Sequence, residues 1–468
     1  MRHEPVYVTE AERLEQESAI QKILELPERP KSFHIVTYGC QMNAHDSEKL
    51  AGLLSQMGMA EASDRRDADF VLFNTCCVRD NAERRALGNV TWLKELKKDK
   101  PALLIGVCGC MVQQPQMAQR ILKQYRFIDL AFGTHNLHCL PSLLYNLLTQ
   151  KSRVVSVTEQ DTLIAEGLPV KRLNPYHAYI TIMYGCDNFC SYCIVPYVRG
   201  RERSRKMADI LAEAEGLLKS GVKEIMLLGQ NVNSYGNGSE GKETFPKLLR
   251  ALDQLGVPRI RFMTSHPKDL SDELIEAMAD CKRVCNHLHL PVQSGNDEIL
   301  RLMNRRYTRE TYLRKVEKLR AAVPGIGLTT DLIVSFPGET ESQFEDTCSL
   351  VREVGYDAAF TFIYSPREGT QAARMEGRIP EAESTRRIEK LIREVEASTA
   401  RVHQSMIGSK EQVLIEGLSK RDPNQVSGKG TRNITITLDG TAGDAGKIIP
   451  VTITSAAVNT LRGERTER

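Results

Sequence analysis

The sequence reads Gly185-Cys186-Asp187-Asn188-Phe189-Cys190-Ser191-Tyr192-Cys193 at one place, which spaces three cysteines as CxxxCxxC with an aromatic residue before the last. Three thiolates on one short loop can bind three irons of a cubic [4Fe–4S] cluster and leave the fourth iron without a protein ligand. A closed zinc site needs four protein ligands, and a disulfide would leave one of three cysteines unpaired. The loop therefore predicts an iron–sulfur cluster held by Cys186, Cys190 and Cys193.

Apolar runs alternate with amphipathic helical stretches from Ala178 onward. The runs cover residues 179–183, 224–228, 260–263, 287–290, 327–334 and 358–363. Six such strand–helix units predict a partial (β/α)6 barrel over residues 172–402, an open relative of the eightfold barrel. The cysteine loop follows the first predicted strand, at the end where barrel enzymes carry their active-site residues.

A second alternation precedes the barrel. Its apolar runs, at residues 33–38, 70–73, 102–107 and 128–132, alternate with helical stretches near 47–57, 82–98, 116–125 and 137–148. Near-continuous apolar strands of this kind predict a parallel, doubly wound α/β domain over residues 31–150. Residues 1–30 are expected to form a partly ordered extension; the alternative is a surface helix over residues 10–26. Residues 151–174 are expected to form a polar linker with an edge strand.

Cysteines follow the predicted strands of this first domain. Cys40 follows the first strand, Cys76 and Cys77 the second, and Cys108 and Cys110 the third. A single cysteine is usually a small core residue. However, loops beyond the carboxyl ends of parallel strands converge on one crevice, so the repeated placement predicts a second site for three cysteines. Spacing alone does not select which three of the five bind there.

The chain ends in short β-like runs at residues 411–416, 431–438 and 448–453, separated by glycines. They predict a small antiparallel β-barrel over residues 405–468, similar in size to oligonucleotide-binding modules. The overall fold class is therefore α/β with a small terminal barrel.

Polar residues just past the later barrel strands, together with Tyr192 beside the last cysteine of the loop, are candidates to bind a cofactor beside the first cluster. An open iron can chelate the amine and carboxylate of an amino acid, and S-adenosylmethionine supplies both. The predicted contacts are Tyr192, Gln230, Asn231, Ser265, Gln293 and Asp331. Alternatively, Tyr192 only packs the loop and the others only cap helices. His287 and His289 share one strand face and are expected to form a hydrogen-bonded interior pair rather than a zinc site.

Basic residues cluster locally although the formal net charge is only +3. The predicted RNA-binding residues are Arg199, Arg201, Arg203, Arg205, Lys420, Arg421, Lys429 and Arg432. The alternative is that these basic residues only form a solvent-exposed surface and bind no RNA. No apolar run is long enough to span a bilayer, and the N-terminus lacks a secretion signal. With twelve cysteines, these features lead us to expect a cytoplasmic protein without a membrane partner.

Several motifs resemble those of the radical S-adenosylmethionine methylthiotransferases, and the resemblance runs nearly end to end. They are Thr37-Tyr-Gly-Cys40-Gln-Met-Asn43, Asn74-Thr-Cys76, Gly109-Cys110-Met111, the stretch from Cys186 to Arg205, His289-Leu-Pro-Val-Gln-Ser-Gly295 and Tyr364-Ser-Pro-Arg367. The family combines an N-terminal cluster domain, a radical barrel and a C-terminal TRAM domain. Val195-Pro-Tyr-Val-Arg-Gly-Arg-Glu-Arg-Ser204 and Thr264-Ser-His-Pro267 are most similar to the branch that acts on isopentenylated adenosine in tRNA.

This resemblance implies that Cys40, Cys76 and Cys110 hold an auxiliary cluster, so that the protein carries two [4Fe–4S] clusters. The implied reaction uses S-adenosylmethionine to insert a methylthio group at carbon 2 of N(6)-isopentenyladenosine beside the anticodon, with sulfur from the auxiliary cluster. Implied partners are a tRNA anticodon stem-loop and an electron donor such as flavodoxin or ferredoxin, and we expect a monomer. The alternatives are a sister enzyme acting on threonylcarbamoyl-adenosine or a ribosomal-protein aspartate, and a non-catalytic iron–sulfur RNA-binding protein.

Overall fold

The computed structural model describes residues 6–77, 80–158, 163–237 and 243–466, with only the backbone of residues 80–82. The chain divides into two compact units. Unit 1 comprises Met1–Leu173, Tyr184–Asp187 and Cys193–Arg205, and unit 2 comprises Asn174–Met183, Asn188–Tyr192 and Lys206–Arg468. Within the described residues, no helix is both long and apolar enough to cross a membrane.

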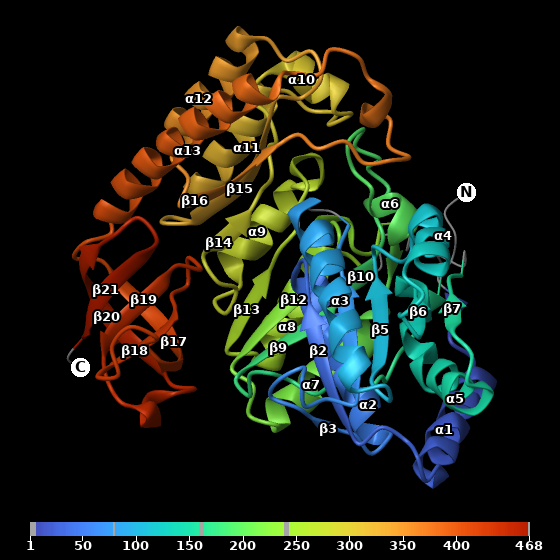
Figure 1. Ribbon diagram of the computed structural model, residues 1–468. Helices are drawn as coiled ribbons and strands as arrows, with labels where there is room; N and C mark the ends of the chain where they lie inside the picture. The colour runs from blue at the N-terminus through green and yellow to red at the C-terminus, as the bar shows by residue number, and fades with distance from the viewer. Residues whose placement is uncertain (1–5, 78–79, 159–162, 238–242, 467–468) are drawn as a thin grey trace. The chain divides into compact units, whose positions relative to one another are not determined.

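Unit 1 is built on a six-stranded sheet with strand order β3-β2-β4-β5-β6-β7, in which every neighbouring pair is parallel (Figure 1). The strands are β2 (Ser32–Thr37), β3 (Ala60–Glu61), β4 (Phe70–Thr75), β5 (Leu104–Gly109), β6 (Leu130–Phe132) and β7 (Val154–Ser156). The chain runs from β2 to one edge and returns with β4 on the other side of β2. The loops after β2 and β4 therefore flank the point where the strand order reverses, a common ligand-binding position in such sheets.

Helices cover both faces of this sheet. They are α1 (Glu10–Glu25), α2 (Gln41–Gln56), α3 (Asp80–Asp99), α4 (Pro115–Gln124) and α5 (Leu140–Gln150). Phe70 and Leu72 of β4 pack with residues of α1, α2 and α5, whereas Val71 and Phe73 pack with residues of α3 and α4. This alternation follows from the period of two along a strand, and it confirms the doubly wound α/β class.

The N-terminal segment is more ordered than the sequence suggested. Thr9 and Glu12 form a capping box at the start of α1, and Ile20 and Ile23 bury their side chains in the core next to α5. Helix α1 is therefore an ordered part of the domain rather than a partly ordered extension. The edge strand expected in the linker is β7, and β8 (Leu163–Ile164) pairs in parallel with β1 (Val6–Tyr7).

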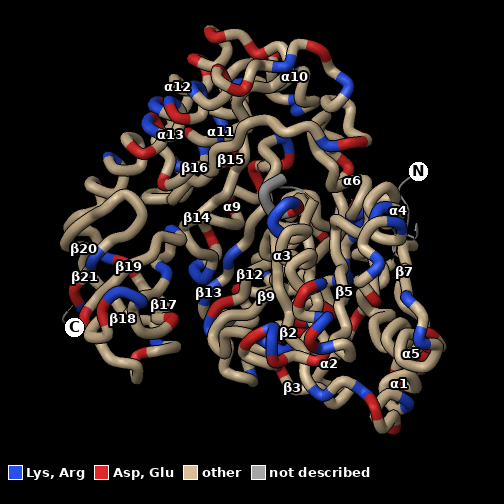
Figure 2. Tube along the Cα trace, in the orientation of Figure 1, with Lys and Arg blue, Asp and Glu red and all other residues tan. Residues whose placement is uncertain are grey.

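Unit 2 contains the predicted partial barrel. Its strands are β9 (His177–Thr181), β12 (Glu224–Leu228), β13 (Arg259–Phe262), β14 (His287–His289), β15 (Gly327–Val334) and β16 (Ala358–Ile363). They form two parallel three-stranded sheets, β13-β12-β9 and β14-β15-β16. The helices are α7 (Met207–Lys219), α8 (Phe245–Leu255), α9 (Asp272–Asp280), α10 (Asp297–Leu302), α11 (Arg309–Ala322), α12 (Glu341–Val354) and α13 (Glu381–Gln404). Basic and acidic residues are interspersed along α13, so that helix presents no field of one sign (Figure 2).

The remaining elements are short. The cysteine loop lies in sequence between β10 (Met183–Tyr184) and α6 (Val195–Val198), and β11 (Arg203–Ser204) follows. Turns of 3-10 helix occur at Thr134–Cys139, Val232–Ser234, Pro267–Asp269, Ala372–Arg374 and Ala442–Asp444.

The C-terminal module is a closed barrel with strand order β17-β18-β19-β21-β20. Its strands are β17 (Lys410–Leu418), β18 (Gln425–Lys429), β19 (Thr435–Asp439), β20 (Ile448–Ala456) and β21 (Thr460–Arg465). The sequence predicted it to be antiparallel, but β19 and β21 pair in parallel. It also missed β18 and β21, because their glycines and charged residues leave no apolar run. Both segments are strands because they pair with neighbouring strands when the barrel closes.

Candidate active site

The cysteines of unit 1 lie where its parallel strands end. Cys40 immediately precedes α2, Cys76 directly follows β4, and Cys110 directly follows β5. Cys76 and Cys110 are buried, whereas Cys40 is exposed. Cys108 differs from the prediction because it lies inside β5 and packs in the core, where burial raises its pKa well above the usual value for a thiol.

Two buried asparagines bind these loops to one another. The Asn43 side chain donates to Oδ1 of Asn74 at 3.3 Å, and the Asn74 side chain donates to the Asn43 carbonyl at 2.8 Å. Gly39 leaves room for this approach, since a Cβ there would lie 2.6 Å from the Cβ of Cys76. Gly39 also has a φ of 128°, a backbone conformation that favours glycine. The structure thus places Cys40 and Cys76 on adjoining loops.

Cys110 lies in a buried polar environment. Arg199, only 5% exposed, donates through Nε to the Cys110 sulfur at 3.2 Å and through Nη2 to Asp46 at 2.7 Å. A hydrogen bond from Cys77 and the positive charge of Arg199 lower the pKa of the Cys110 thiol. Cys110 is thereby prepared to act as a thiolate, the form that binds metals.

The cysteine loop begins with a glycine that no other residue can replace. Gly185 has a φ of 74°, and a Cβ there would lie 2.0 Å from the Arg201 carbonyl oxygen. The Cys186 amide donates to the Gly200 carbonyl at 3.2 Å, and Arg201 pairs with Asp187 at 2.7 Å. Local backbone crowding therefore requires a glycine directly before Cys186.

The middle of the loop is anchored to the segment after α10. The Ser191 amide donates to the Met303 carbonyl at 3.0 Å, and the Asn304 side chain donates to the Phe189 carbonyl at 2.9 Å. Arg305, 4% exposed, donates through Nη1 to the Cys190 sulfur at 3.5 Å. Sequence reasoning did not select Arg305, because its segment is distant from the loop along the chain.

Strained backbones and unpartnered polar atoms both occur just after the barrel strands. Thr264, Gln293 and Ser335 follow β13, β14 and β15, with φ values of 67°, 73° and 59°. Such backbones cost roughly 1–3 kcal/mol each and cluster at functional sites. Several polar atoms here are buried and lack a hydrogen-bond partner among the described residues. They are Asn231 Oδ1, Ser265 Oγ, His266 Nε2, Gln293 Oε1 and Ser335 Oγ.

The other predicted contacts of S-adenosylmethionine have different surroundings. Gln230 is half-buried just after β12. Tyr192 packs against the core cluster around Ile299 and Phe336, which agrees with the packing alternative; its contact with S-adenosylmethionine stays a prediction. Asp331 lies within β15 rather than past its end, and it is 3.5 Å from His289.

The two barrel histidines form the predicted interior pair. His287 and His289 are both hydrogen-bonded to the Thr329 hydroxyl, at 2.9 and 3.0 Å. Both are buried, and burial lowers the pKa of His287 well below its usual value. Strand periodicity was sufficient here, because alternate residues face the same side.

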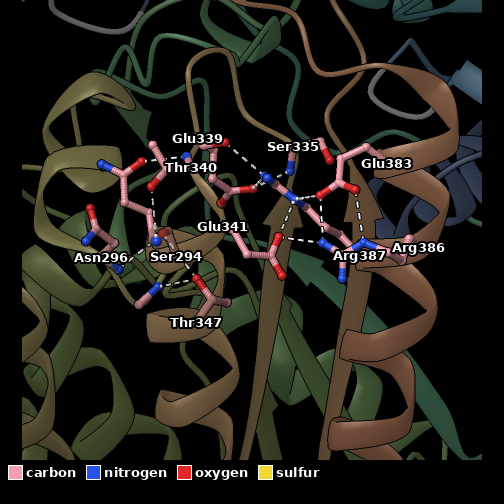
Figure 3. A network of polar contacts seen from close by, with 12 residues as sticks. Ser294, Asn296, Ser335, Glu339, Thr340, Glu341, Thr347, Glu383, Arg386 and Arg387 are labelled. Carbon is pink, nitrogen blue, oxygen red and sulfur yellow. Dashed lines mark hydrogen bonds and ion pairs between the residues drawn. The ribbon is translucent and has the colours of Figure 1, made fainter.

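A buried acid network follows β15. The amide of Ser335 donates to Glu339 at 2.7 Å, and Arg387 of α13 pairs with Glu339 at 3.0 Å (Figure 3). Arg387 also pairs with Glu383 at 2.8 Å. Burial raises the pKa of Glu339 to about 7 despite the guanidinium. The network fixes the loop that carries Ser335, a residue that the sequence analysis missed.

Three of the four arginines predicted to bind RNA beside the cysteine loop are buried. Arg203 donates to the carbonyls of Leu163 and Arg199, and Arg205 forms a two-contact ion pair with Glu166 at 2.5 and 2.6 Å. With Arg199 bound to Asp46, these donors serve contacts inside unit 1. Arg201 is the exposed member, at 44% of its side-chain area.

The terminal module divides its basic residues in the same way. Lys420 and Arg421 are exposed in the loop between β17 and β18. Lys429 donates to the Thr435 hydroxyl at 2.8 Å, and Arg432 forms an ion pair with the buried Asp357 at 2.5 Å. Arg432 therefore attaches the module to the partial barrel. Arg259 and Arg261 of β13 share Glu224 and reinforce this attachment by donating to carbonyls of residues 412 and 429–431.

The residues present fit an iron–sulfur cluster and S-adenosylmethionine. No three His, Cys, Asp or Glu side chains in the described ranges converge as the ligands of a single metal ion do, so donor chemistry decides the fit. Cys190 presents a soft sulfur ligand next to a buried cation. The unpartnered oxygens and ring nitrogen at the strand ends match the amine, ribose and adenine groups of S-adenosylmethionine.

Comparison with known proteins identifies the family. Family models match in chain order: Uncharacterized protein family UPF0004 over residues 32–133, Radical SAM superfamily over 180–351 and TRAM domain over 404–465. The tRNA-2-methylthio-N(6)-dimethylallyladenosine synthase of Alkaliphilus oremlandii is 49% identical, covering 98% of both chains. The chain belongs to this synthase family.

Two further synthases support this assignment. The one from Caldicellulosiruptor saccharolyticus is 51% identical over 93% of this chain and 92% of its own. The one from Acetivibrio thermocellus is 47% identical over 98% of this chain and 97% of its own. These alignments cover more than nine-tenths of both proteins, so this chain and the three synthases are of nearly equal length.

Solved structures agree on the fold. The radical S-adenosylmethionine methyltransferase TsrM from Kitasatospora setae has a TM-score of 0.54 at 15% identity, covering 73% of this chain and 77% of its own. The cobalamin-dependent S-adenosylmethionine radical enzyme OxsB has a TM-score of 0.50 at 12% identity, covering 80% of this chain and 57% of its own. At such identities the likeness concerns the fold alone.

Proposed function

We propose that this protein is a tRNA methylthiotransferase that inserts a methylthio group at carbon 2 of N(6)-isopentenyladenosine beside the anticodon. The observation that carries the proposal is the identity of 47% to 51% to synthases of that name over more than nine-tenths of the chain. An unactivated aromatic C–H bond resists polar chemistry, which explains the need for a radical barrel. The inserted sulfur needs a source, which explains the second cysteine site.

Cys186, Cys190 and Cys193 would hold the radical cluster. When bound there, a [4Fe–4S] cluster with one open iron supplies the electron that cleaves S-adenosylmethionine to a 5′-deoxyadenosyl radical. The protein's part is to orient that molecule and exclude water. Asn231, Ser265 and Gln293 would do so with the polar atoms that they bury at the strand ends. Tyr192, Gln230 and Asp331 are proposed as further contacts.

Cys40, Cys76 and Cys110 would hold a second, auxiliary cluster, which supplies the inserted sulfur. The adjoining loops of Cys40 and Cys76 and the lowered pKa of Cys110 support this set. Cys108 is excluded from our proposal because it lies in the core of β5. Cys77, which hydrogen-bonds to Cys110, remains the competing ligand.

RNA binding is proposed for the exposed basic residues first, namely Arg201, Lys420 and Arg421. All three side chains are exposed to solvent, where the phosphates of an anticodon stem-loop can reach them. We further propose that the protein is a monomer and that it acts in the cytoplasm, where its tRNA substrate lies. Its electrons would come from a flavodoxin or ferredoxin, because a low-potential cluster requires a low-potential donor.

Mass spectrometry of modified nucleosides tests the reaction. A strain lacking the gene should lose the methylthio group from isopentenyladenosine and regain it when the gene is restored. If the methylthio form of isopentenyladenosine persists and that of threonylcarbamoyl-adenosine is lost instead, the protein has the sister activity.

Anaerobic reconstitution tests the chemistry directly. Purified protein should contain about eight irons and eight acid-labile sulfides per chain, the content of two clusters. With dithionite and S-adenosylmethionine it should release 5′-deoxyadenosine. Full iron content without that release, even when substrate RNA is present, would favour a non-catalytic iron–sulfur RNA-binding protein.

A further inference from the structure

Arg305 is a buried cation that lacks a carboxylate partner. It is 4% exposed, and its polar contacts are the Cys190 sulfur, the Tyr307 hydroxyl and the Pro291 carbonyl. Within the described ranges no Asp or Glu forms an ion pair with it. Burial raises the pKa of Tyr307 to about 12, so that group is neutral. A buried charge without a counter-ion is costly, which implies that a negative charge completes the site.

Other buried arginines of unit 2 have carboxylates. Arg387, 4% exposed, pairs with Glu339, and Arg259 and Arg261, at 4% and 3%, share Glu224. The lack of a partner at Arg305 is therefore specific to the position beside Cys190.

The backbone around Arg305 is strained to hold this position. Asn304 and Arg306, the residues on either side, have φ values of 57° and 49°. Asn304 is fixed by its hydrogen bond to the Phe189 carbonyl, and Met303 by that from the Ser191 amide. Strain of this kind persists only where the surrounding contacts over-determine it. Here the contacts that do so come from the residues immediately flanking Cys190.

We propose that Arg305 is the counter-charge of the radical cluster, a positioning residue that makes this cluster easier to reduce. The inference rests on the proposed function, because it requires Cys190 to be a cluster ligand. A thiolate-ligated cluster is anionic, and one-electron reduction adds a negative charge. A guanidinium at the sulfur stabilises the reduced form more than the oxidised one, and hydrogen bonds to the sulfurs are known to set such potentials.

The test is a redox titration of the full-length, reconstituted enzyme, followed by electron paramagnetic resonance. The signal of the radical cluster is the one that changes when S-adenosylmethionine is added. In Arg305→Met, we expect the ratio of reduced to oxidised cluster at the wild-type midpoint to fall about tenfold, equivalent to 59 mV for a one-electron couple. Arg306→Met removes the exposed neighbouring charge and should leave the midpoint unchanged.

A second readout needs no activity. Without the cluster, Arg305→Met should be at least as stable to urea as the wild type, because it removes an unpaired buried charge. Loading the cluster should then stabilise the wild type more than the variant. If Arg305→Met cannot be loaded, Arg305→Gln carries the test, since it keeps N–H donors but loses the charge. A wild-type midpoint in Arg305→Gln would overturn the proposal.

Two outcomes separate this proposal from the proposed function. Wild-type protein that binds no iron, or releases no 5′-deoxyadenosine, refutes the function itself. An unchanged midpoint together with weaker binding of S-adenosylmethionine in Arg305→Met refutes only the counter-charge, and assigns Arg305 to the co-substrate.

Discussion

Arg199 in unit 1 and Arg305 in unit 2 each donate to the sulfur of a predicted cluster ligand, yet their charges are balanced differently. Arg199 lies 3.2 Å from the Cys110 sulfur and pairs with Asp46 at 2.7 Å. Arg305 lies 3.5 Å from the Cys190 sulfur and pairs with no carboxylate in the described residues. The cysteine that is proposed to hold the sulfur-donating cluster thus meets a neutral ion pair. The cysteine proposed for electron transfer meets a net positive charge.

This difference matches the tasks proposed for the two sites. A cluster that must accept an electron gains from a nearby cation, because the cation stabilises the reduced form. A cluster that donates sulfur needs its ligands held in place, which a compensated ion pair achieves without shifting the potential as strongly. Each of the following experiments changes one side of the comparison.

The largest effect is expected from removing the cysteines themselves. Cys190→Ala should abolish both 5′-deoxyadenosine release and the methylthio product. Cys110→Ala should retain 5′-deoxyadenosine release but lose the product, as measured by liquid chromatography and mass spectrometry. Cys348→Ala and Cys108→Ala, in the cores of the two units, serve as controls that should retain both activities. Methylthiolation by Cys110→Ala would show that Cys77 is the ligand instead.

A smaller effect is expected from breaking the compensated pair. Arg199→Met should destabilise the cluster-free protein by about 3–5 kcal/mol, because it leaves Asp46 buried and unpaired. Urea denaturation measures this loss, and the double variant Arg199→Met with Asp46→Asn should recover most of it. Arg305→Met should show no such loss. Equal destabilisation by the two single variants would remove the contrast between the sites.

The network at Glu339 provides a pH-dependent reference for a buried arginine that does have carboxylates. The raised pKa means that the folded state binds the Glu339 proton more tightly than the unfolded state, whose value is near 4.5. Stability should therefore fall as pH rises from 4.5 to about 7, by at most about 3 kcal/mol. Thermal unfolding across this range should show a shallower decline in Glu339→Gln. Parallel curves for the two proteins would contradict the raised pKa.

The smallest effects should come from exposed charges. Arg201→Ala should cost less than about 1 kcal/mol of stability, because its ion pair with Asp187 is solvent-exposed. If Arg201, Lys420 and Arg421 bind phosphates, each substitution to alanine should weaken tRNA binding several-fold and lower the salt dependence by about one unit. Arg13→Ala, an exposed change on α1, is the matched control for these binding measurements.

Apolar periodicity was sufficient for the architecture because strands and helices of α/β folds must bury regular faces. It identified all six strands of the partial barrel and placed Cys40, Cys76 and Cys110 after parallel strands. It failed in the C-terminal module, where β18 and β21 are paired through barrel closure rather than through an apolar run. The basic run after the cysteine loop was expected either to bind RNA or to be a solvated face, whereas Arg203 and Arg205 are buried.

The sequence by itself determined the family, the strand order along the chain and the cysteine motifs, because those depend on residue type and local spacing. Only the tertiary structure decided which charges are buried and what balances them. Asp46 and Arg199 are separated by 153 residues along the chain, and Cys190 and Arg305 are separated by 115. Electrostatic compensation depends on distances in space, and no local pattern encodes a contact between segments so far apart.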